Sequence, residues 1–307
     1  MPDDETVTYP GAHRPDRRRI VRSGGLDLAV YEWGPSDAPP ILAAHGGFDF
    51  AGTFDVFGPL LVEGGWRLVS WDHRGHGDSQ HAQLYSWDCD IRDAIAVLDS
   101  IGQEPIPLLG HSKGGSLMLQ LAEACPWRCS ALVNIDGLPS RSRMTDTADH
   151  ERTRTMAADV AAWLDRRRHL VDKERRPGTI DELAKRRAVM NPRLSHEWLR
   201  YLVTIGARRD LDGWRWRIDP TLRMGGFGPW RPEWRLHQAA NVAAPFLVLL
   251  GLQPEAMGWG TGPDDVKPWL PPGAQAMGFD DVGHFVHIEQ PERTASIVLD
   301  FLAAELP

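Results

Sequence analysis

Two hydrophobic patterns alternate in the first and last parts of the chain. Short, nearly continuous apolar runs predict buried strands, and stretches with apolar residues three and four positions apart predict helices packed on a sheet. Strands are expected at residues 40–44, 105–109, 131–135, 245–251 and 274–279. The clearest helix covers residues 115–122. This alternation predicts an α/β fold with a mostly parallel central sheet flanked by helices.

The middle of the chain lacks this alternation and predicts an inserted all-helical lid. A charged, alanine-bearing stretch from about Thr147 to Leu170 is the first expected helix. Thr179 and Glu182 have the spacing of a capping box that opens a second, and Ser195 is the expected cap of a third. We therefore divide the chain into a disordered tail (1–17), a core (18–137 and 241–307) and a lid (138–240).

A serine motif lies between the strand predicted at 105–109 and the helix after it. Gly110-His111-Ser112-Lys113-Gly114 has the form G-x-S-x-G. A tight strand-to-helix turn forces such a serine into a strained backbone conformation, which exposes its hydroxyl above the sheet edge. The glycines let neighbouring backbone come close, and the helix N-terminus favours negative charge on a substrate. Ser112 is the predicted nucleophile.

A candidate general base lies near the C-terminus. His284 follows the predicted strand 274–279, on a loop that can reach over a serine at the same sheet edge. From there it would take the hydroxyl proton and return it to the leaving group. His287 is the alternative, but its position where the next helix or loop begins favours a packing or capping role.

Small residues after the first buried strand predict an oxyanion hole. The strand 40–44 ends in His45-Gly46-Gly47-Phe48, where a backbone N–H can point at the serine. Together the N–H groups of Gly47 and Lys113 would hold the negative oxygen of a tetrahedral intermediate.

These pieces together resemble the α/β-hydrolase family, over about residues 20–137 and 240–305. The segment Trp71–Ser79 adds to the resemblance, which implies structural roles for Asp72 and Arg74 in the turn after a core strand. His73 and His76 are expected to pack this glycine-rich turn, since no third ligand accompanies them. No metal or organic cofactor is expected.

The acid that would complete a catalytic triad has two candidates. The family usually carries it three residues after a glycine at the end of the penultimate strand, but Pro254 occupies that place and Glu255 comes one residue late. Asp136 follows the strand 131–135, a strand end where several branches of the family carry their acid. We favour Asp136, because a short carboxylate on a rigid strand end holds an imidazole well. Glu255 remains the alternative.

Tryptophans of the lid are candidates for lining a substrate pocket. Indoles suit an apolar pocket with a polar rim, although about half of them are expected only to pack the lid onto the core. The candidate substrate contacts are Phe48, His111, Trp214 and Trp216. The arginine-rich runs 166–168 and 173–176 are expected to be solvated helix faces.

Composition narrows the class of protein. A net charge of −8 argues against general nucleic-acid binding. No apolar run is long enough to span a membrane, and the polar N-terminus does not have the form of a signal peptide. Three cysteines, an odd number, fit reduced thiols in a cytoplasmic protein. The sequence leaves open whether the protein is a monomer or a homodimer.

The sequence thus predicts a serine hydrolase that cleaves a carboxylic ester or lactone of a fairly apolar small molecule. Ser112 would attack the carbonyl, His284 would transfer the proton and Asp136 would orient the histidine. Two alternatives stay open. One is a hydrolase of carbon–carbon bonds or a cofactor-free oxygenase, which use the same set of groups. The other is a ligand-binding or receptor-like module without turnover.

Overall fold

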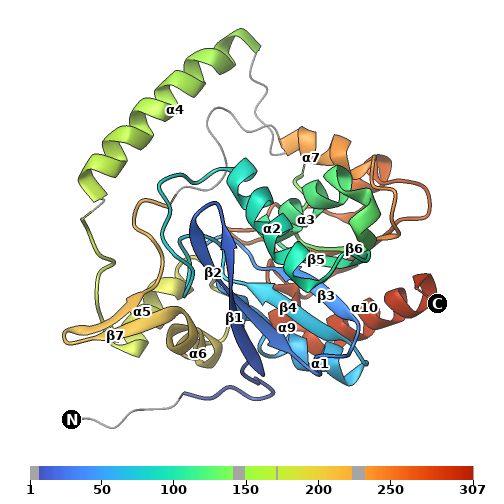
Figure 1. Ribbon diagram of the computed structural model, residues 1–307, viewed down its shortest axis with the longest axis horizontal. Helices are drawn as coiled ribbons and strands as arrows, with labels where there is room; N and C mark the ends of the chain where they lie inside the picture. The colour runs from blue at the N-terminus through green and yellow to red at the C-terminus, as the bar shows by residue number, and fades with distance from the viewer. Residues whose placement is uncertain (1–6, 141–148, 171, 223–231, 307) are drawn as a thin grey trace.

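A single eight-stranded sheet forms the centre of the protein (Figure 1). The computed structural model describes residues 7–140, 149–170, 172–222 and 232–306. The strands are β1 (Arg17–Ser23), β2 (Leu26–Trp33), β3 (Pro40–Ala44), β4 (Arg67–Trp71), β5 (Ile106–His111), β6 (Cys129–Ile135), β9 (Phe246–Gly251) and β10 (Gln275–Phe279). Their order is β1-β2-β4-β3-β5-β6-β9-β10. All pairs from β4 to β10 are parallel, and β1 and β2 add an antiparallel edge.

Helices cover both faces of this sheet. One layer contains α2 (Trp87–Ile101), α3 (Lys113–Ala124) and α7 (Pro232–Ala239). The other contains α1 (Phe57–Glu63) and α10 (Pro291–Glu305). Short helical turns complete the core: η1 (Ala51–Phe54), η2 (Pro126–Arg128), α8 (Pro263–Val266), η4 (Lys267–Trp269) and α9 (Val286–Glu289).

Alternating side chains of each central strand enter different cores. In β9, Phe246, Val248 and Leu250 pack under the α2–α3 layer. Leu247 and Leu249 pack under the α1–α10 layer. Burial on both faces explains why these strands are continuous apolar runs, as is usual for parallel sheets covered by helices. The predicted fold class is confirmed, and the five expected strands lie in it.

The insertion between β6 and β9 is not all-helical. It contains α4 (Asp149–Leu170), α5 (Ile180–Ala188) and α6 (His196–Gly206), and also a hairpin of β7 (Ala207–Asp210) and β8 (Gly213–Trp216). The expectation of a purely helical lid is therefore wrong, because the Asp-Leu-Asp-Gly stretch at 210–213 turns the chain between two short antiparallel strands. The expected start of the first helix at Thr147 lies outside the described residues.

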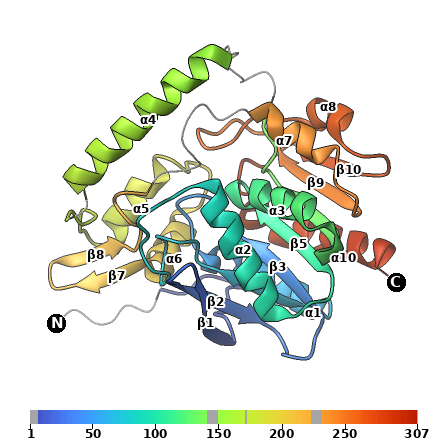
Figure 2. The same cartoon turned by 45° about the horizontal axis from the view of Figure 1, so that its top comes forward.

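The parts of the insertion differ in how they meet the core. Figure 1 and Figure 2 both show α4 on the outside of the molecule, away from the sheet. In contrast, α5, α6 and the hairpin pack through a third apolar cluster that includes Phe50, Trp198 and Phe285. Helix α7 lies within the range assigned to the lid, yet Leu236 and Ala239 belong to the core cluster.

The disordered tail predicted for residues 1–17 is wrong for residues 9–17, and Arg17 already belongs to β1. The N–H of His13 donates to the carbonyl of Asp55 at 2.7 Å, and the indole of Trp33 donates to the carbonyl of His13 at 3.0 Å. The ring of Tyr9 packs edge-on against Trp198 with centroids 5.0 Å apart. A polar sequence hides these contacts because the partners lie far away in the chain. Residues 1–6 lie outside the described residues.

Gly114 fixes how closely α3 approaches β3. A Cβ at this position would lie 2.1 Å from the carbonyl oxygen of Ala44, a backbone atom that cannot swing aside. Gly114→Ala should therefore lower the free energy of unfolding by about 3 kcal/mol or more, as overpacking against backbone does. Denaturant unfolding checks this. In the control Gly262→Ala the added Cβ has its nearest contact at 3.7 Å, and a change within about 1 kcal/mol is expected. Equal effects of the two substitutions would contradict this account.

Candidate active site

Ser112 occupies a strained turn between β5 and α3. Its φ of 54° lies in the left-handed region, which non-glycine residues seldom adopt. Its N–H donates to the carbonyl of Ile135 at 2.9 Å, so the turn is bonded directly to the end of β6. The serine is half-buried, whereas His111 and Lys113 on either side are buried. Such an elbow keeps one hydroxyl accessible in an otherwise packed sheet edge.

The structure brings Ser112, His284 and Asp136 into one hydrogen-bonded chain. Nε2 of His284 lies 2.8 Å from Oγ of Ser112. Nδ1 of the same ring lies 2.5 Å from Oδ2 of Asp136. The histidine and the aspartate are each 2% exposed. Because the carboxylate accepts the Nδ1 proton, Nε2 is left to accept the proton of the serine hydroxyl.

Asp136 reaches the histidine because of its position on β6. It directly follows the strand, which lies beside β5 in the sheet, and its N–H donates to the carbonyl of Leu249 on β9 at 2.7 Å. Its φ of 47° is again in the left-handed region. The backbone conformation that turns the chain away from the sheet thus also places the carboxylate near the end of β5.

The alternative residues occupy other positions. Oε2 of Glu255 accepts the backbone N–H of His284 at 2.6 Å, so this carboxylate fixes the main chain of the histidine and not its ring. His287 is fully buried, and its Nε2 lies 3.2 Å from the hydroxyl of Thr53. Neither residue takes part in the hydrogen-bonded chain of Ser112.

The loop after β3 lies against the nucleophile. A Cβ on Gly46 would lie 3.4 Å from Cβ of Ser112 and 3.0 Å from the ring of His111, so a larger residue would require these side chains to shift. Gly47 follows, and Phe48 has a φ of 58°. Lys113 is the first residue of α3, where backbone N–H groups have no partner within the helix. Its ammonium group is buried in an ion pair with Asp90 at 2.7 Å.

Comparison with known families agrees with this geometry. The family model described as the alpha/beta hydrolase fold matches residues 39–291, which is most of the chain. The chain belongs to the α/β-hydrolase fold family. The expected family resemblance is thereby confirmed.

The similarity to known relatives covers nearly the whole length of this α/β-hydrolase. A serine hydrolase-like protein from Danio rerio is 25% identical over 291 residues, covering 92% of this chain and 86% of the relative. The sn-1-specific diacylglycerol lipase ABHD11 from Mus musculus is 25% identical, with 88% and 83% covered. A hypothetical protein from Pseudomonas aeruginosa PAO1 of known structure is 26% identical, with a TM-score of 0.76 and coverage of 93% and 99%. The protein is thus a hydrolase of the α/β-hydrolase superfamily.

A cavity of about 450 Å³ lies between the insertion and the loop after β3. Phe48, Trp216, Ile218 and Met257 are among its apolar lining residues. Ser112, His284 and Asp136 are not among its lining residues, but two of those residues are next to the site in the chain: Phe48 follows Gly47, and Met257 precedes Gly258, where a Cβ would lie 3.6 Å from Cβ of His284. Two of the four candidate substrate contacts, Phe48 and Trp216, therefore line this cavity.

The other two candidate contacts lie elsewhere. His111 is 1% exposed, and its ring packs against His284, with centroids 4.7 Å apart. Its Nε2 donates to the carbonyl of His284 at 2.9 Å, so His111 fixes the main chain of His284. Trp214 is half-buried in the apolar cluster of the insertion, and its main chain pairs with Gly178.

Sequence reasoning missed two residues that hold the loop after β3. Nε2 of His76 accepts the N–H of Phe48 at 3.1 Å. Nη1 of Arg187, on α5, donates to the carbonyl of Phe48 at 2.7 Å. The segment containing His76 was recognisable as a loop-packing turn, but its partner was not. Arg187 carries no sequence signal, because one arginine on an amphipathic helix resembles the others.

The described residues contain no helix with the length and apolar character needed to cross a membrane. In the same part of the chain, no group of three His, Cys, Asp or Glu side chains is arranged to hold a metal ion. His45, His73 and His76 lie close together, with the rings of His45 and His73 4.0 Å apart, but their nitrogens bond to the main chain.

Five buried histidines lie around Ser112, His284 and the loop after β3. Burial lowers the pKa of each below the ordinary value of 6.5, and to about 3 for two of them: His45, His73, His76 (about 3), His111 and His287 (about 3). Burial also raises the pKa of Asp55 and Asp72 to about 6. Burial therefore keeps the histidines neutral to lower pH than in the unfolded chain, and it lets the two aspartates take up a proton at higher pH than in the unfolded chain.

Folding stability should fall as the pH is lowered below 6.5. The unfolded chain then takes up protons on five histidines that stay neutral in the folded protein, so protonation favours unfolding. Asp55 and Asp72 act in the opposite direction between about pH 6 and pH 3.8, because there the folded state binds the extra proton, but they offset only part of the effect. Urea unfolding at several pH values measures the slope.

A single substitution tests the origin of this slope. His287→Gln keeps a polar atom near Thr53 and should reduce the protons taken up on unfolding near pH 5 by about one. His169→Gln is the control, since the side chain of His169 is 72% exposed and should leave the slope unchanged. A wild-type slope in the His287 variant would contradict the assignment.

Proposed function

We propose that the protein hydrolyses carboxylic esters or lactones through Ser112, His284 and Asp136. The carrying observation is the chain of contacts from the serine hydroxyl through both ring nitrogens to the carboxylate, at 2.8 Å and 2.5 Å. Nucleophile, base and orienting acid within hydrogen-bond distance are the requirement for activating a serine hydroxyl.

The reaction would begin with attack of Oγ of Ser112 on the ester carbonyl carbon. Nε2 of His284 takes the hydroxyl proton as the new C–O bond forms, and Asp136 stabilises the resulting imidazolium. The imidazolium then gives the proton to the departing alkoxide, so that the original C–O bond breaks and an acyl-serine remains. Water repeats these steps: His284 removes its proton, and Ser112 leaves with that proton.

Negative charge on the carbonyl oxygen would be held by backbone donors. The N–H of Lys113 stands at the start of α3, where the helix dipole also favours an anion. The N–H of Gly47 is the second donor in this proposal. The bonds from Phe48 to His76 and Arg187 support it, because they fix the N–H and the carbonyl of the residue that follows Gly47.

The ester class rests on two further observations. A similar protein from Mus musculus is named as a diacylglycerol lipase, which acts on esters of apolar acids. The cavity beside Phe48 has apolar walls of Trp216, Ile218 and Met257, which suit a hydrocarbon chain. In this proposal, α5, α6 and the β7–β8 hairpin act as the lid over the substrate.

Ser112→Ala should abolish ester hydrolysis and leave the fold intact. The hydroxyl of this half-buried serine contributes little to packing, whereas loss of the nucleophile should cost several orders of magnitude in kcat/KM. A fluorophosphonate probe, which loses fluoride to an activated serine, should label the wild type and not this variant. Ser116→Ala is the control and should still be labelled, because the hydroxyl of Ser116 donates to the carbonyl of Gly137 and is not bonded to His284. Labelling that survives in Ser112→Ala would refute the assignment.

Asp136→Asn should reduce kcat by about three to four orders of magnitude, because an amide favours the wrong imidazole tautomer. Glu255→Gln should cost far less, since an amide oxygen can still accept the N–H of His284. Steady-state kinetics on one ester compare the two variants under the same conditions. A larger loss of kcat in Glu255→Gln than in Asp136→Asn would identify Glu255, on the loop after β9, as the acid.

A further inference from the structure

We propose that the cavity beside Phe48 binds a carboxylate at the far end of the substrate, so that the preferred ester has an anionic tail. This inference deepens the proposed ester hydrolysis and rests on it for the position of the scissile bond. It would change the expected substrate from a fairly apolar molecule to an amphipathic one.

Four arginines are among the residues that line this cavity, and none of its lining residues is an aspartate or a glutamate. The cations are Arg175, Arg176, Arg186 and Arg187, all from α5 and the segment before it. A wall with one sign of charge attracts the opposite charge. Guanidinium groups match a carboxylate especially well, because their planar N–H groups can donate two parallel hydrogen bonds. Two of these arginines belong to a run that the sequence alone places on a solvated helix face.

The bonds of these arginines are mostly to neutral carbonyl groups. Arg175 donates to the carbonyls of Ile218 and Asp219, at 3.1 and 3.0 Å. Arg186 donates to those of Arg176 and Pro177, with Glu182 at 3.9 Å. Carbonyl partners satisfy N–H groups without neutralising the charge. The cavity therefore keeps a net positive wall.

Burial makes that uncompensated charge costly. It lowers the pKa of Arg175, which the charge of Asp219 only partly opposes and that of Arg166 reinforces. It likewise lowers the pKa of Arg187, where Asp49 is the opposing charge. Nε of Arg187 is buried and has no hydrogen-bond partner among the described residues. A bound anion would supply the missing negative charge.

Asn191 gives an independent sign of a missing ligand. This residue lines the cavity and is 1% exposed, yet both Oδ1 and Nδ2 of its side chain lack a hydrogen-bond partner within the described part of the chain. Buried amide groups are nearly always paired, so an unpaired one in a cavity wall points to a polar ligand. Its Nδ2 can donate to a carboxylate oxygen beside the arginines.

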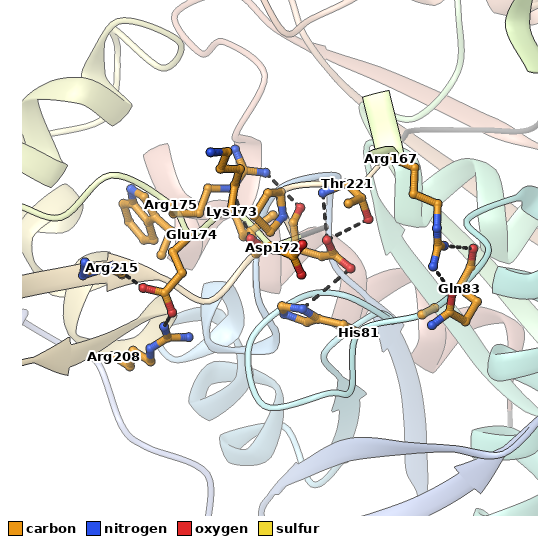
Figure 3. Close-up of a pocket in the computed structure, with 15 residues that line it drawn as sticks. His81, Gln83, Arg167, Asp172, Lys173, Glu174, Arg175, Arg208, Arg215 and Thr221 are labelled. Atoms are coloured by element: carbon orange, nitrogen blue, oxygen red, sulfur yellow. Dashed lines mark hydrogen bonds and ion pairs between the residues drawn. The ribbon is translucent and has the colours of Figure 1, made fainter. Parts of the chain in front are cut away.

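A neighbouring cavity of about 350 Å³ provides a contrast (Figure 3). It shares Arg175, Trp216 and Ile218 with the first cavity and is also rich in charge. There, however, Glu174 pairs with Arg208 at 2.6 Å and with Arg215 at 3.1 Å. Opposite charges within its own wall leave less need for an anion, so we assign the ligand to the cavity beside Phe48.

The test compares esters that differ only in the tail. The 4-nitrophenyl monoesters of adipic, suberic and sebacic acid carry a free carboxylate, and their methyl-capped counterparts are neutral. In the wild type, kcat/KM should be about tenfold or more higher for the acid of the best-fitting length, as expected for charge-assisted hydrogen bonds. No preference for the acid at any length, or a preference for the capped ester, would overturn the inference.

Arg176→Gln should reduce this preference by about tenfold, the loss of one charge-assisted bond. Its side chain is exposed at the cavity and forms no hydrogen bond or ion pair with other described residues, so the fold should tolerate the change. Lys185→Gln is the matched control: it removes the same charge from the exposed surface of α5, outside the cavity lining. Equal effects of the two substitutions would mean that only overall charge matters, which contradicts a built site.

Asn191→Leu separates binding from folding. Replacing an unpaired buried amide by an apolar group of similar size should leave the unfolding midpoint unchanged or raise it. The same substitution should lower the preference for the carboxylate. A variant that unfolds more easily and keeps the preference would show that the amide has a purely structural role.

Calorimetry keeps this inference distinct from the proposed hydrolysis. Suberic acid monoamide, which has no ester, should bind Ser112→Ala at least about tenfold more tightly than octanamide, and Arg176→Gln should remove the difference. If Ser112→Ala binds in this way but the wild-type protein hydrolyses none of the esters, the anion site is supported and the proposed function is refuted. Ester turnover with equal binding of the two amides would support the proposed function and refute the anion site.

Discussion

Three strained residues at the carboxyl ends of neighbouring strands organise the site. Phe48, Ser112 and Asp136 follow β3, β5 and β6, and among the described non-glycine residues only these three have a positive φ. Such conformations cost about 1–3 kcal/mol each and persist only where surrounding packing imposes them. For Ser112 the parallel sheet supplies this packing, because the turn of Ser112 is bonded to the end of β6. The close approach at Gly114 fixes the same turn from the side of β3.

His284 and the loop after β3 are each held through their main chain. His284 is fixed at its N–H by Glu255 and at its carbonyl by His111, so its ring is free to bond Ser112 and Asp136. Phe48 is held in the same way, at its N–H and at its carbonyl. One of these partners, Arg187, belongs to α5. Docking of the insertion onto the core and the geometry of the loop after β3 are therefore coupled through this guanidinium group, and also through His76, which is bridged to Ile218 of the insertion.

The sequence predicted what local patterns control and missed what distant contacts decide. Strands, the serine turn and the loop histidine follow from apolar runs and turn residues, which act within a few positions. Asp136 and Glu255 were harder to distinguish, because their roles depend on which atom of His284 each carboxylate reaches. The contacts of Tyr9 and His13 with distant aromatic and loop residues gave no local signal. For the same reason Arg176 resembled a solvated cation, although it lines a cavity.

An acid on β6 changes what the loop after β9 can do. If that loop carried the acid, its backbone would have to orient a carboxylate toward the imidazole. With Asp136 in that position, Glu255 is free to fix the main chain of His284, and Met257 two residues later lines the cavity. The loop thus joins His284 to the wall of the cavity beside Phe48. In the proposed function, a substrate tail that contacts Met257 would act on the same short segment that holds the main chain of His284, so tail recognition and proton transfer would depend on one loop.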